Sequence, residues 1–312
     1  MPHFLGIDGG GTRTTAWLAR LGGQADRRGC VLARAEAGPS NPLKVGLKVA
    51  QREILRAARS VVGAGFKPAP TGAVLEAVVA GIAGVDRPQI HRPLARWLRK
   101  AIPARFHLLT TDAAIALHAA LGNAPGIIVV SGTGSIAYGQ DGRGRVFRAG
   151  GWGSQFDDAG SGYDLGRKAI AAALRAHDGR GPRTQLTAKI CRAFKLRDIT
   201  QVVGRELTSL EIAGLFPLVL EAARRRDAAA NQLLDDAGRD LAELALALVK
   251  RERWSRRPIP VVLAGGVFHS SARVRRSFVR QLRRTAPRAR VTLLRRAPVE
   301  GALDLARKKG VL

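Results

Sequence analysis

The chain is poor in cysteine, histidine and long apolar runs, and each shortage excludes a class of protein. Its 312 residues include two cysteines, Cys30 and Cys191, which fit neither a disulfide framework nor a metal-ligand spacing. The six histidines show no metal spacing either. No apolar run approaches the roughly 20 residues that a membrane span needs, and no basic-then-apolar leader precedes the first expected strand. The sequence therefore predicts a cytoplasmic protein with no membrane partner.

Acidic residues are also scarce: the chain has 24 acidic and 52 basic residues, which gives a net charge of +28. From Arg251 to the C-terminus, seventeen basic residues accompany three acidic ones. Such an excess is typical of a nucleic-acid surface, but it also follows from an arginine-rich composition. Aromatic residues are only 5%, and no helix-turn-helix, zinc-finger or RNA-binding signature is present. We therefore expect a solvated basic surface and no specific nucleic-acid partner.

The order of apolar segments predicts an α/β protein in which one scheme occurs twice. In each half, three short strands come first; we expect them at 3–8, 14–20 and 29–37, and again at 127–130, 136–139 and 145–148. A long, mostly helical region over 159–254 precedes a strand at 260–263 and a closing helix from Glu300. The turn signal "LGNAPG" favours a domain boundary there, giving domains 1–121 and 122–312, with the last helix a candidate to pack back on the first domain.

Two glycine-rich turns with hydroxyl residues occupy equivalent places in the two halves, in "GIDGGGTRTT" and "VVSGTGSIAYG". Exposed backbone N–H groups at such turns suit a phosphate. A carboxylate beside a phosphate needs a cation, so Asp8 suggests Mg²⁺. A plain Asp-Gly hairpin is the alternative for the first turn. The second satisfies G-x-G-x-x-A but leads into a strand, which excludes a dinucleotide fold, and no P-loop is present.

Further polar residues stand at the ends of expected strands or in loops. Asp112 lies where a strand ends and a helix begins. It could act as a catalytic base for phosphoryl transfer, or it could be a structural acidic residue that complements the helix dipole. Trp152 and the Asp157-Asp158 pair could contact a sugar, although an N-capping acid explains the pair equally well. Turn chemistry alone would account for Asn41. The Gly265-Gly266 pair suits a nucleoside or close helix packing.

These segments in this order resemble the BadF/BcrA-type ATPase family. The resemblance rests on "GIDGGGTRT", "PSNP", "TTDAAIAL", "VVSGTGSIAYG", "GGWGSQFDDAGSGYDLG", "LAGGVF" and "APVEGALDLA" and spans nearly the whole chain. Within the family, the chain is most similar to N-acetylglucosamine and glucosamine kinases, which belong to the actin-like superfamily. The resemblance implies an α/β fold of two ribonuclease H-like (actin-like ATPase) domains flanking a nucleotide- and sugar-binding cleft. It also implies that the protein transfers the γ-phosphate of ATP to the 6-hydroxyl of an amino sugar and uses Mg²⁺. Dimers are common among such proteins, so a homodimer is one candidate oligomeric state.

The resemblance also implies roles for individual residues. Asp8 would bind Mg-ATP and the metal, and Asp112 would be the catalytic base for the sugar hydroxyl. The implied ATP contacts are Gly9, Gly10, Gly11, Thr12, Thr14, Ser131, Gly132, Thr133, Gly134, Ser135, Gly265, Gly266 and Gly301. The implied sugar contacts are Asn41, Asp112, Thr133, Gly151, Trp152 and Asp158. One departure is Ala159, which replaces a glutamate usual in the family and leaves the choice of amino sugar open.

Three rival functions are weighed against this prediction. Dehydratase-activator ATPases of the same family need cysteines for an iron–sulfur cluster, and Cys30 and Cys191 are poorly placed for one. Regulators of the glucokinase-like group carry a cysteine-rich zinc loop and a DNA-binding domain, both absent from this sequence. A non-enzymatic polymer or chaperone protein is disfavoured by the "SNP" and "GGWG" segments. N-acetylglucosamine, glucosamine, N-acetylmuramic acid and glucose remain open as substrates.

Overall fold

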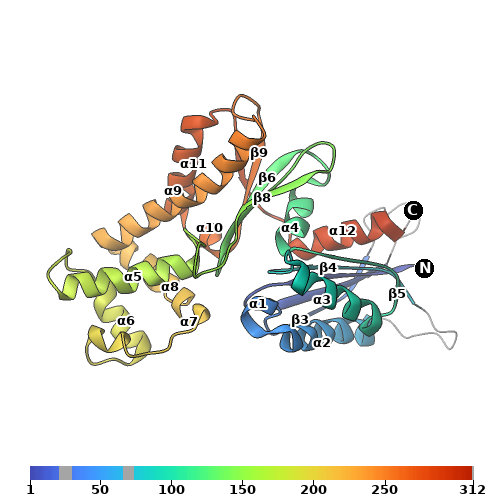
Figure 1. The fold of residues 1–312 in the computed structure, drawn as a ribbon, viewed down its shortest axis with the longest axis horizontal. Helices are drawn as coiled ribbons and strands as arrows, with labels where there is room; N and C mark the ends of the chain where they lie inside the picture. Colours follow the sequence, from blue (N-terminus) through green and yellow to red (C-terminus); the bar gives the residue numbers. More distant parts are fainter. Residues whose placement is uncertain (21–29, 66–73, 311–312) are drawn as a thin grey trace. The chain divides into compact units, whose positions relative to one another are not determined.

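The computed structural model of the chain describes residues 1–20, 30–65 and 74–310 (Figure 1). Two compact units divide the chain. Unit 1 comprises Met1–Ala124 and Leu294–Leu312, and unit 2 comprises Pro125–Leu293. The division after Ala124 lies three residues from the boundary expected after residue 121, and the closing helix belongs to unit 1.

Unit 1 contains a five-stranded mixed sheet in the order β3-β2-β1-β4-β5. Its strands are β1 (His3–Gly9), β2 (Thr14–Arg20), β3 (Cys30–Ala37), β4 (Leu75–Ile82) and β5 (Ala104–Thr110). Its helices are α1 (Pro42–Val45), α2 (Leu47–Gly65), α3 (Pro88–Ala101), α4 (Asp112–Leu121) and α12 (Pro298–Gly310). Strands β1 to β3 are antiparallel neighbours, whereas β1, β4 and β5 run parallel.

Alternation along β1 sends its side chains to two different apolar clusters, as expected for a strand that is covered on both faces. Leu5 and Ile7 join the cluster that α2 and α3 complete. Phe4 joins the opposite cluster, to which α4 and α12 contribute Ile115 and Leu303. Asp8 has the same parity as Phe4, so it lies on the α4 and α12 side of the sheet, at the end of the strand.

Unit 2 repeats the same sheet order, here written β8-β7-β6-β9-β10. The strands are β6 (Gly126–Ser131), β7 (Ser135–Gln140), β8 (Val146–Gly150), β9 (Pro260–Ala264) and β10 (Arg290–Leu293). The β6–β7–β8 strands are antiparallel, and β6, β9 and β10 are parallel, as in unit 1. The predicted α/β class with a repeated scheme is therefore confirmed, and the two glycine turns join equivalent strand pairs, β1–β2 and β6–β7.

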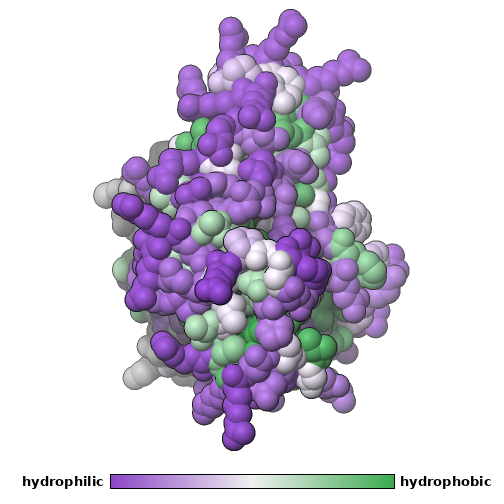
Figure 2. All heavy atoms as spheres, turned by 90° about the vertical axis from the view of Figure 1, so that its left-hand side faces the viewer, coloured by the Kyte–Doolittle hydropathy of each residue, from purple (hydrophilic) through white to green (hydrophobic). Residues whose placement is uncertain are grey.

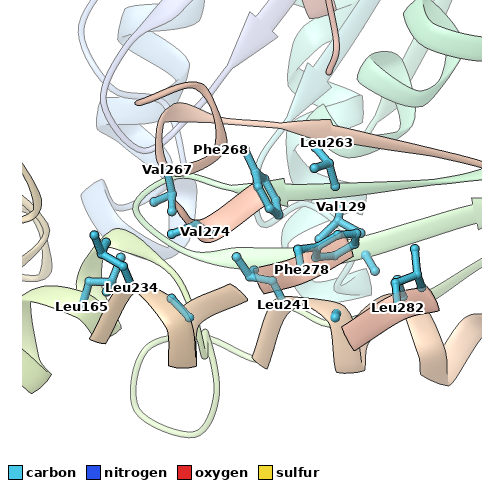
Figure 3. Close-up of a cluster of buried hydrophobic side chains, with 14 of the residues drawn as sticks. Val129, Leu165, Leu234, Leu241, Leu263, Val267, Phe268, Val274, Phe278 and Leu282 are labelled. Carbon is cyan, nitrogen blue, oxygen red and sulfur yellow. The ribbon is translucent and has the colours of Figure 1, made fainter. Parts of the chain in front are cut away.

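A helical region between β8 and β9 distinguishes unit 2 from unit 1. It comprises α5 (Gly162–His177), α6 (Leu186–Phe194), the 3₁₀ helix η1 (Ile199–Val202), α7 (Ser209–Ala213), α8 (Phe216–Arg224) and α9 (Ala228–Arg251). After β9 come α10 (Gly266–Ser270) and α11 (Ala272–Thr285), which packs along α9. Figure 3 shows the resulting core, in which Phe278 of α11 and Leu241 of α9 lie beneath Val129 of β6.

Candidate active site

The β1–β2 turn of unit 1 is held by backbone hydrogen bonds that leave two amides unused. The Gly10 N–H donates to the Arg13 carbonyl at 2.9 Å, and the Gly10 carbonyl accepts from the N–H groups of Ser40 and Asn41. Within the described part of the chain, the N–H groups of Gly11 and Thr12 make no hydrogen bond. Two free amides at a tight turn can bind an anion, as the sequence predicts for this segment.

Two carboxyl groups stand beside this turn. Asp112 is the first residue of α4, after the N-cap Thr111, and its Oδ1 accepts the N–H of Ala113 at 2.9 Å. Burial raises the pKa of Asp112 to about 6, although hydrogen bonds from backbone N–H groups oppose the shift and the charge of Asp86 adds to it. Burial and, to a smaller extent, the negative charge of Asp112 together raise the pKa of Asp8 to about 7, against the opposing charge of Arg13.

The electrostatics of Asp8 fit a cation. Its ionised form is disfavoured by burial and by a like charge, and a bound cation would relieve both effects. A carboxylate oxygen is the kind of ligand that Mg²⁺ uses together with substrate phosphates. Among the described residues, no group of three or more His, Cys, Asp or Glu side chains could hold a metal alone. A cavity of about 420 Å³ opens beside Asp8, with the guanidinium groups of Arg13 and Arg34 in its lining.

Asn41 forms the N-cap of α1, and its Oδ1 accepts the N–H of Leu43 at 3.0 Å. The turn explanation for Asn41 is thus realised in the structure. The same residue is nevertheless tied to the glycine turn, because its backbone N–H donates to the Gly10 carbonyl at 3.1 Å. The structure therefore brings the PSNP segment beside the β1–β2 turn of unit 1.

Two of the expected ATP contacts in unit 1 have structural explanations instead. Thr14 is fully buried, and its hydroxyl is bonded to the Gly38 carbonyl and to Ser40 Oγ, both at 2.7 Å. Gly301 lies where α12 crosses α4, and a Cβ there would come within 2.0 Å of the Ile115 carbonyl oxygen. The Thr14 hydroxyl is not available to a phosphate, and close helix packing accounts for Gly301.

In unit 2, the β6–β7 turn is braced by the segment that follows β8. Ser131 Oγ donates to the Gly160 carbonyl at 3.0 Å, and Ser135 Oγ donates to the Ala159 carbonyl at 2.8 Å. The N–H of Gly162 donates to the carbonyl of Gly132 at 2.8 Å. Because both serine hydroxyls point into this brace, they position the turn and do not face a ligand.

The donors left to the turn are those of Thr133 and Gly134. Their N–H groups make no hydrogen bond within the described residues, and both residues are partly exposed. Asp158 lies beneath them, 5% exposed and at a positive φ of 68°. Its Oδ1 accepts the N–H of Ser135 at 3.0 Å. Asp158, which we expected from the sequence to contact a sugar, therefore also supports the β6–β7 turn.

The remaining expected contacts of unit 2 lie in two further loops. Trp152 is 58% exposed, and the guanidinium carbon of Arg148 lies 4.2 Å from its ring centroid. Gly151, with φ of 75°, packs against Ile136. Gly265 has φ of 94°, and a Cβ there would come within 2.2 Å of the Ser131 carbonyl oxygen. The β9–α10 turn thus rests directly on the β6–β7 turn. Gly266 faces open space.

The sequence analysis did not identify a partly buried ion network that lies next to Gly160. Asp164 is 6% exposed, its Oδ2 accepts the N–H of Gly160 at 3.0 Å, and Lys168 Nζ lies 2.7 Å from it. Lys168 Nζ also lies 2.9 Å from Asp240 Oδ2. Burial would lower the pKa of Lys168, but its bonds to the two carboxylates raise it. The i,i+4 spacing of Asp164 and Lys168 could have indicated half of this network.

The fold is similar to that of a ROK family glucokinase from Streptomyces griseus solved with glucose and AMPPNP (TM-score 0.62, 21% identity, 98% and 99% of the chains covered). The model of the BadF/BadG/BcrA/BcrD ATPase family matches residues 5–303. The chain belongs to this family.

Two relatives at about the same identity cover almost the whole chain. The N-acetylmuramic acid/N-acetylglucosamine kinase of Clostridium acetobutylicum is 31% identical over 316 residues, 99% of each protein. A structure from Chromobacterium violaceum, provisionally described as an N-acetylglucosamine kinase, has a TM-score of 0.79 at 30% identity and covers 98% and 99% of the chains.

None of the helices in the described residues is long and apolar enough to span a membrane.

Proposed function

We propose that the chain is an ATP-dependent amino-sugar kinase that transfers the γ-phosphoryl group of ATP to the 6-hydroxyl of N-acetylglucosamine or glucosamine. The observation that carries the proposal is in unit 1. Asp112 at the start of α4 lies near enough to Asp8 for its charge to raise the pKa of Asp8, beside a turn with two free amides. Phosphoryl transfer depends mainly on positioning and on charge neutralisation, and these groups can supply both. The names of the relatives support an amino sugar as the acceptor.

Asp112 acts as the proton acceptor in this proposal. As the sugar oxygen forms its bond to the γ-phosphorus, the bond from that phosphorus to the β,γ-bridging oxygen breaks and ADP leaves. The hydroxyl proton passes to the Asp112 carboxylate, which releases it to solvent after the product leaves. With a pKa of about 6, Asp112 is mostly ionised at neutral pH and is a stronger base than an ordinary aspartate.

We assign phosphate binding to the two glycine-rich turns, β1–β2 and β6–β7. In unit 1 we assign it to the amides of Gly11 and Thr12, together with Asp8, which would hold Mg²⁺. The ion, when bound, would offset the negative charge of the phosphate groups. In unit 2 we assign phosphate binding to Thr133 and Gly134.

The remaining candidate residues are assigned to the sugar acceptor and to the adenosine of ATP. We assign the sugar to Asn41, Gly151, Trp152 and Asp158, and the adenosine to the open backbone at Gly266. The exposed indole face of Trp152 is suited to the apolar face of a sugar ring.

A coupled assay of ADP release tests the activity. The wild-type protein is assayed with Mg-ATP and N-acetylglucosamine, glucosamine, N-acetylmuramic acid or glucose, and we expect turnover to be highest with one of the first two. Asp178→Asn, which alters an exposed carboxylate in unit 2, is the control for Asp112→Asn. Turnover with none of the four sugars, together with no thermal stabilisation by Mg-ATP, would refute the kinase assignment.

A further inference from the structure

Unit 2 has a second concave surface that shares no residue with the proposed active site. This basic groove, of about 620 Å³, lies between α11 and the edge strand β10 and is lined by Leu263, Ala272, Arg275, Arg276, Val279, Arg280, Arg283, Val291, Thr292 and Leu293. Its floor is apolar, because Val279, Val291 and Leu293 are half-buried at the margin of the unit 2 core. Its rim is a row of arginines.

The lining residues of α11 form one face of the helix, at positions i, i+3, i+4, i+7, i+8 and i+11 from Ala272. The opposite face carries Val274, Phe278 and Leu282, which Figure 3 shows packed into the core. Among the described groove residues of α11, only Val279 packs against the unit 2 core. The groove face is a second, separate amphipathic face of α11.

The arginines of this face differ in whether they have partners. Arg275 donates to the carbonyl groups of Phe268 and His269. Arg276, Arg280 and Arg283 are exposed, and within the described residues they form no ion pair or hydrogen bond. They follow each other at i, i+4 and i+7, so they span about 10 Å along the helix axis.

We propose that the basic groove binds an acidic amphipathic helix of a partner protein. Apolar side chains of such a helix would cover Val279, Val291 and Leu293, and carboxylates repeating at i, i+4 and i+7 would match the three unpaired guanidinium groups. This complementarity of charge and apolar surface is what selects the occupant. The inference is independent of the proposed kinase function.

Two other occupants fit the groove less well. A single-stranded nucleic acid would use aromatic side chains to stack its bases, and none of the residues that line this groove is aromatic. A second copy of the chain in a two-fold contact would place one arginine row against the other, which like-charge repulsion opposes. The chain carries a net charge of +28, and hydrophilic residues cover most of the surface in view in Figure 2, so charge alone does not mark a partner site. The apolar floor does.

The test measures binding of labelled probes to the full chain by fluorescence anisotropy. The first probe is a synthetic peptide of about 18 residues, long enough to form a helix in water, with leucines on one face and glutamates at i, i+4 and i+7 beside it. The second is a permuted peptide of the same composition without an apolar face, and the third is a single-stranded oligonucleotide. We expect the first peptide to bind at least roughly tenfold more tightly than the permuted one.

Two variants and one control locate the site. Arg276→Glu/Arg280→Glu/Arg283→Glu is expected to weaken the amphipathic peptide by roughly tenfold or more. Its control reverses the same number of charges elsewhere in unit 2, at Arg183, Arg197 and Arg224, which are exposed and form no ion pair within the described residues. The control is expected to weaken binding much less. Val279→Asn should weaken the peptide but not the oligonucleotide.

Other outcomes overturn the proposal. Equal binding of both peptides, with equal losses in the two triple variants, would mean attraction by net charge alone. Preference for the oligonucleotide would identify a nucleic-acid surface instead. Self-association that the groove variant abolishes would identify an interface between copies. Kinase turnover and melting temperature, measured on every variant, confirm that the substitutions leave the fold and the proposed active site intact.

Discussion

Replacing Asp112 by asparagine is expected to remove the proton acceptor while leaving the start of α4 unchanged. Asparagine retains an oxygen in the position of Oδ1, which accepts the Ala113 N–H at 2.9 Å. The helix is capped by Thr111, whose hydroxyl accepts the N–H of Ala114, so the cap does not depend on the substituted side chain. A loss of activity in this variant therefore reports on the chemistry of the carboxylate.

The pKa of about 6 sets the size of the effect and its pH dependence. At pH 7, about 90% of Asp112 is ionised, and below pH 6 the ionised fraction falls roughly tenfold per pH unit. kcat/KM of the wild type should follow this fraction, since it reports the free enzyme. General-base contributions are roughly 10²–10⁴-fold. Turnover of Asp112→Asn should fall by that range, and ATP affinity should stay close to the wild-type value.

The assay is ADP release at saturating Mg-ATP over a range of sugar concentrations, from pH 5 to 8, for the wild type and for Asp112→Asn, so that kcat and kcat/KM are both obtained. The variant should be slow at every pH and should lack the acidic limb near pH 6. Near-normal turnover, or an unchanged acidic limb in the variant, would show that Asp112 only begins a helix. Asp158 would then be the next carboxylate to test as the base.

Three further predictions concern stability and phosphate binding. Burial and a like charge raise the pKa of Asp8 to about 7. Because the folded state then keeps the proton to a higher pH than the unfolded state, the protein loses stability as the pH rises from about 4 to 7 and regains none above it. Asp8→Asn should therefore melt a few degrees above the wild type at pH 8 and at the same temperature at pH 4, and equal melting at pH 8 would contradict the shift. Thr133→Ala removes a hydroxyl that makes no hydrogen bond within the described residues, so it should weaken ATP binding at an unchanged melting temperature. Ser135→Ala should instead lose about 1–3 kcal/mol of stability, because it leaves the Ala159 carbonyl unsatisfied. The reverse pattern, by calorimetry, would contradict the assignment. Gly265→Ala should destabilise unit 2 strongly, because the added Cβ would clash with the Ser131 backbone, whereas Gly266→Ala should fold normally. Similar melting curves for the two variants would refute the argument.

Local patterns in the sequence determined the elements and several site residues. Alternating apolar residues and glycine turns predict the strands on both sides of each hairpin, because periodicity and turn geometry are properties of short segments. Asp112 is placed at the end of a strand and the start of a helix for the same reason. The repeated scheme in the two halves then predicts that the β1–β2 and β6–β7 turns occupy equivalent positions, and the sheet orders agree.

The direction of each hydroxyl and carboxylate was decided only by the tertiary structure. Ser131 and Ser135 bond to carbonyls 29 and 24 residues away, and Thr14 bonds to Ser40, 26 residues away. From the sequence, the hydroxyls of Thr14, Ser131 and Ser135 were all possible donors to a phosphate. A turn pattern does not show which of these donors form hydrogen bonds within the protein instead. Lys168 likewise meets Asp240 only because α5 and α9 pack together. Hydrogen bonds between distant segments depend on how the sheet and helices assemble, and short-range propensity carries no information about that assembly.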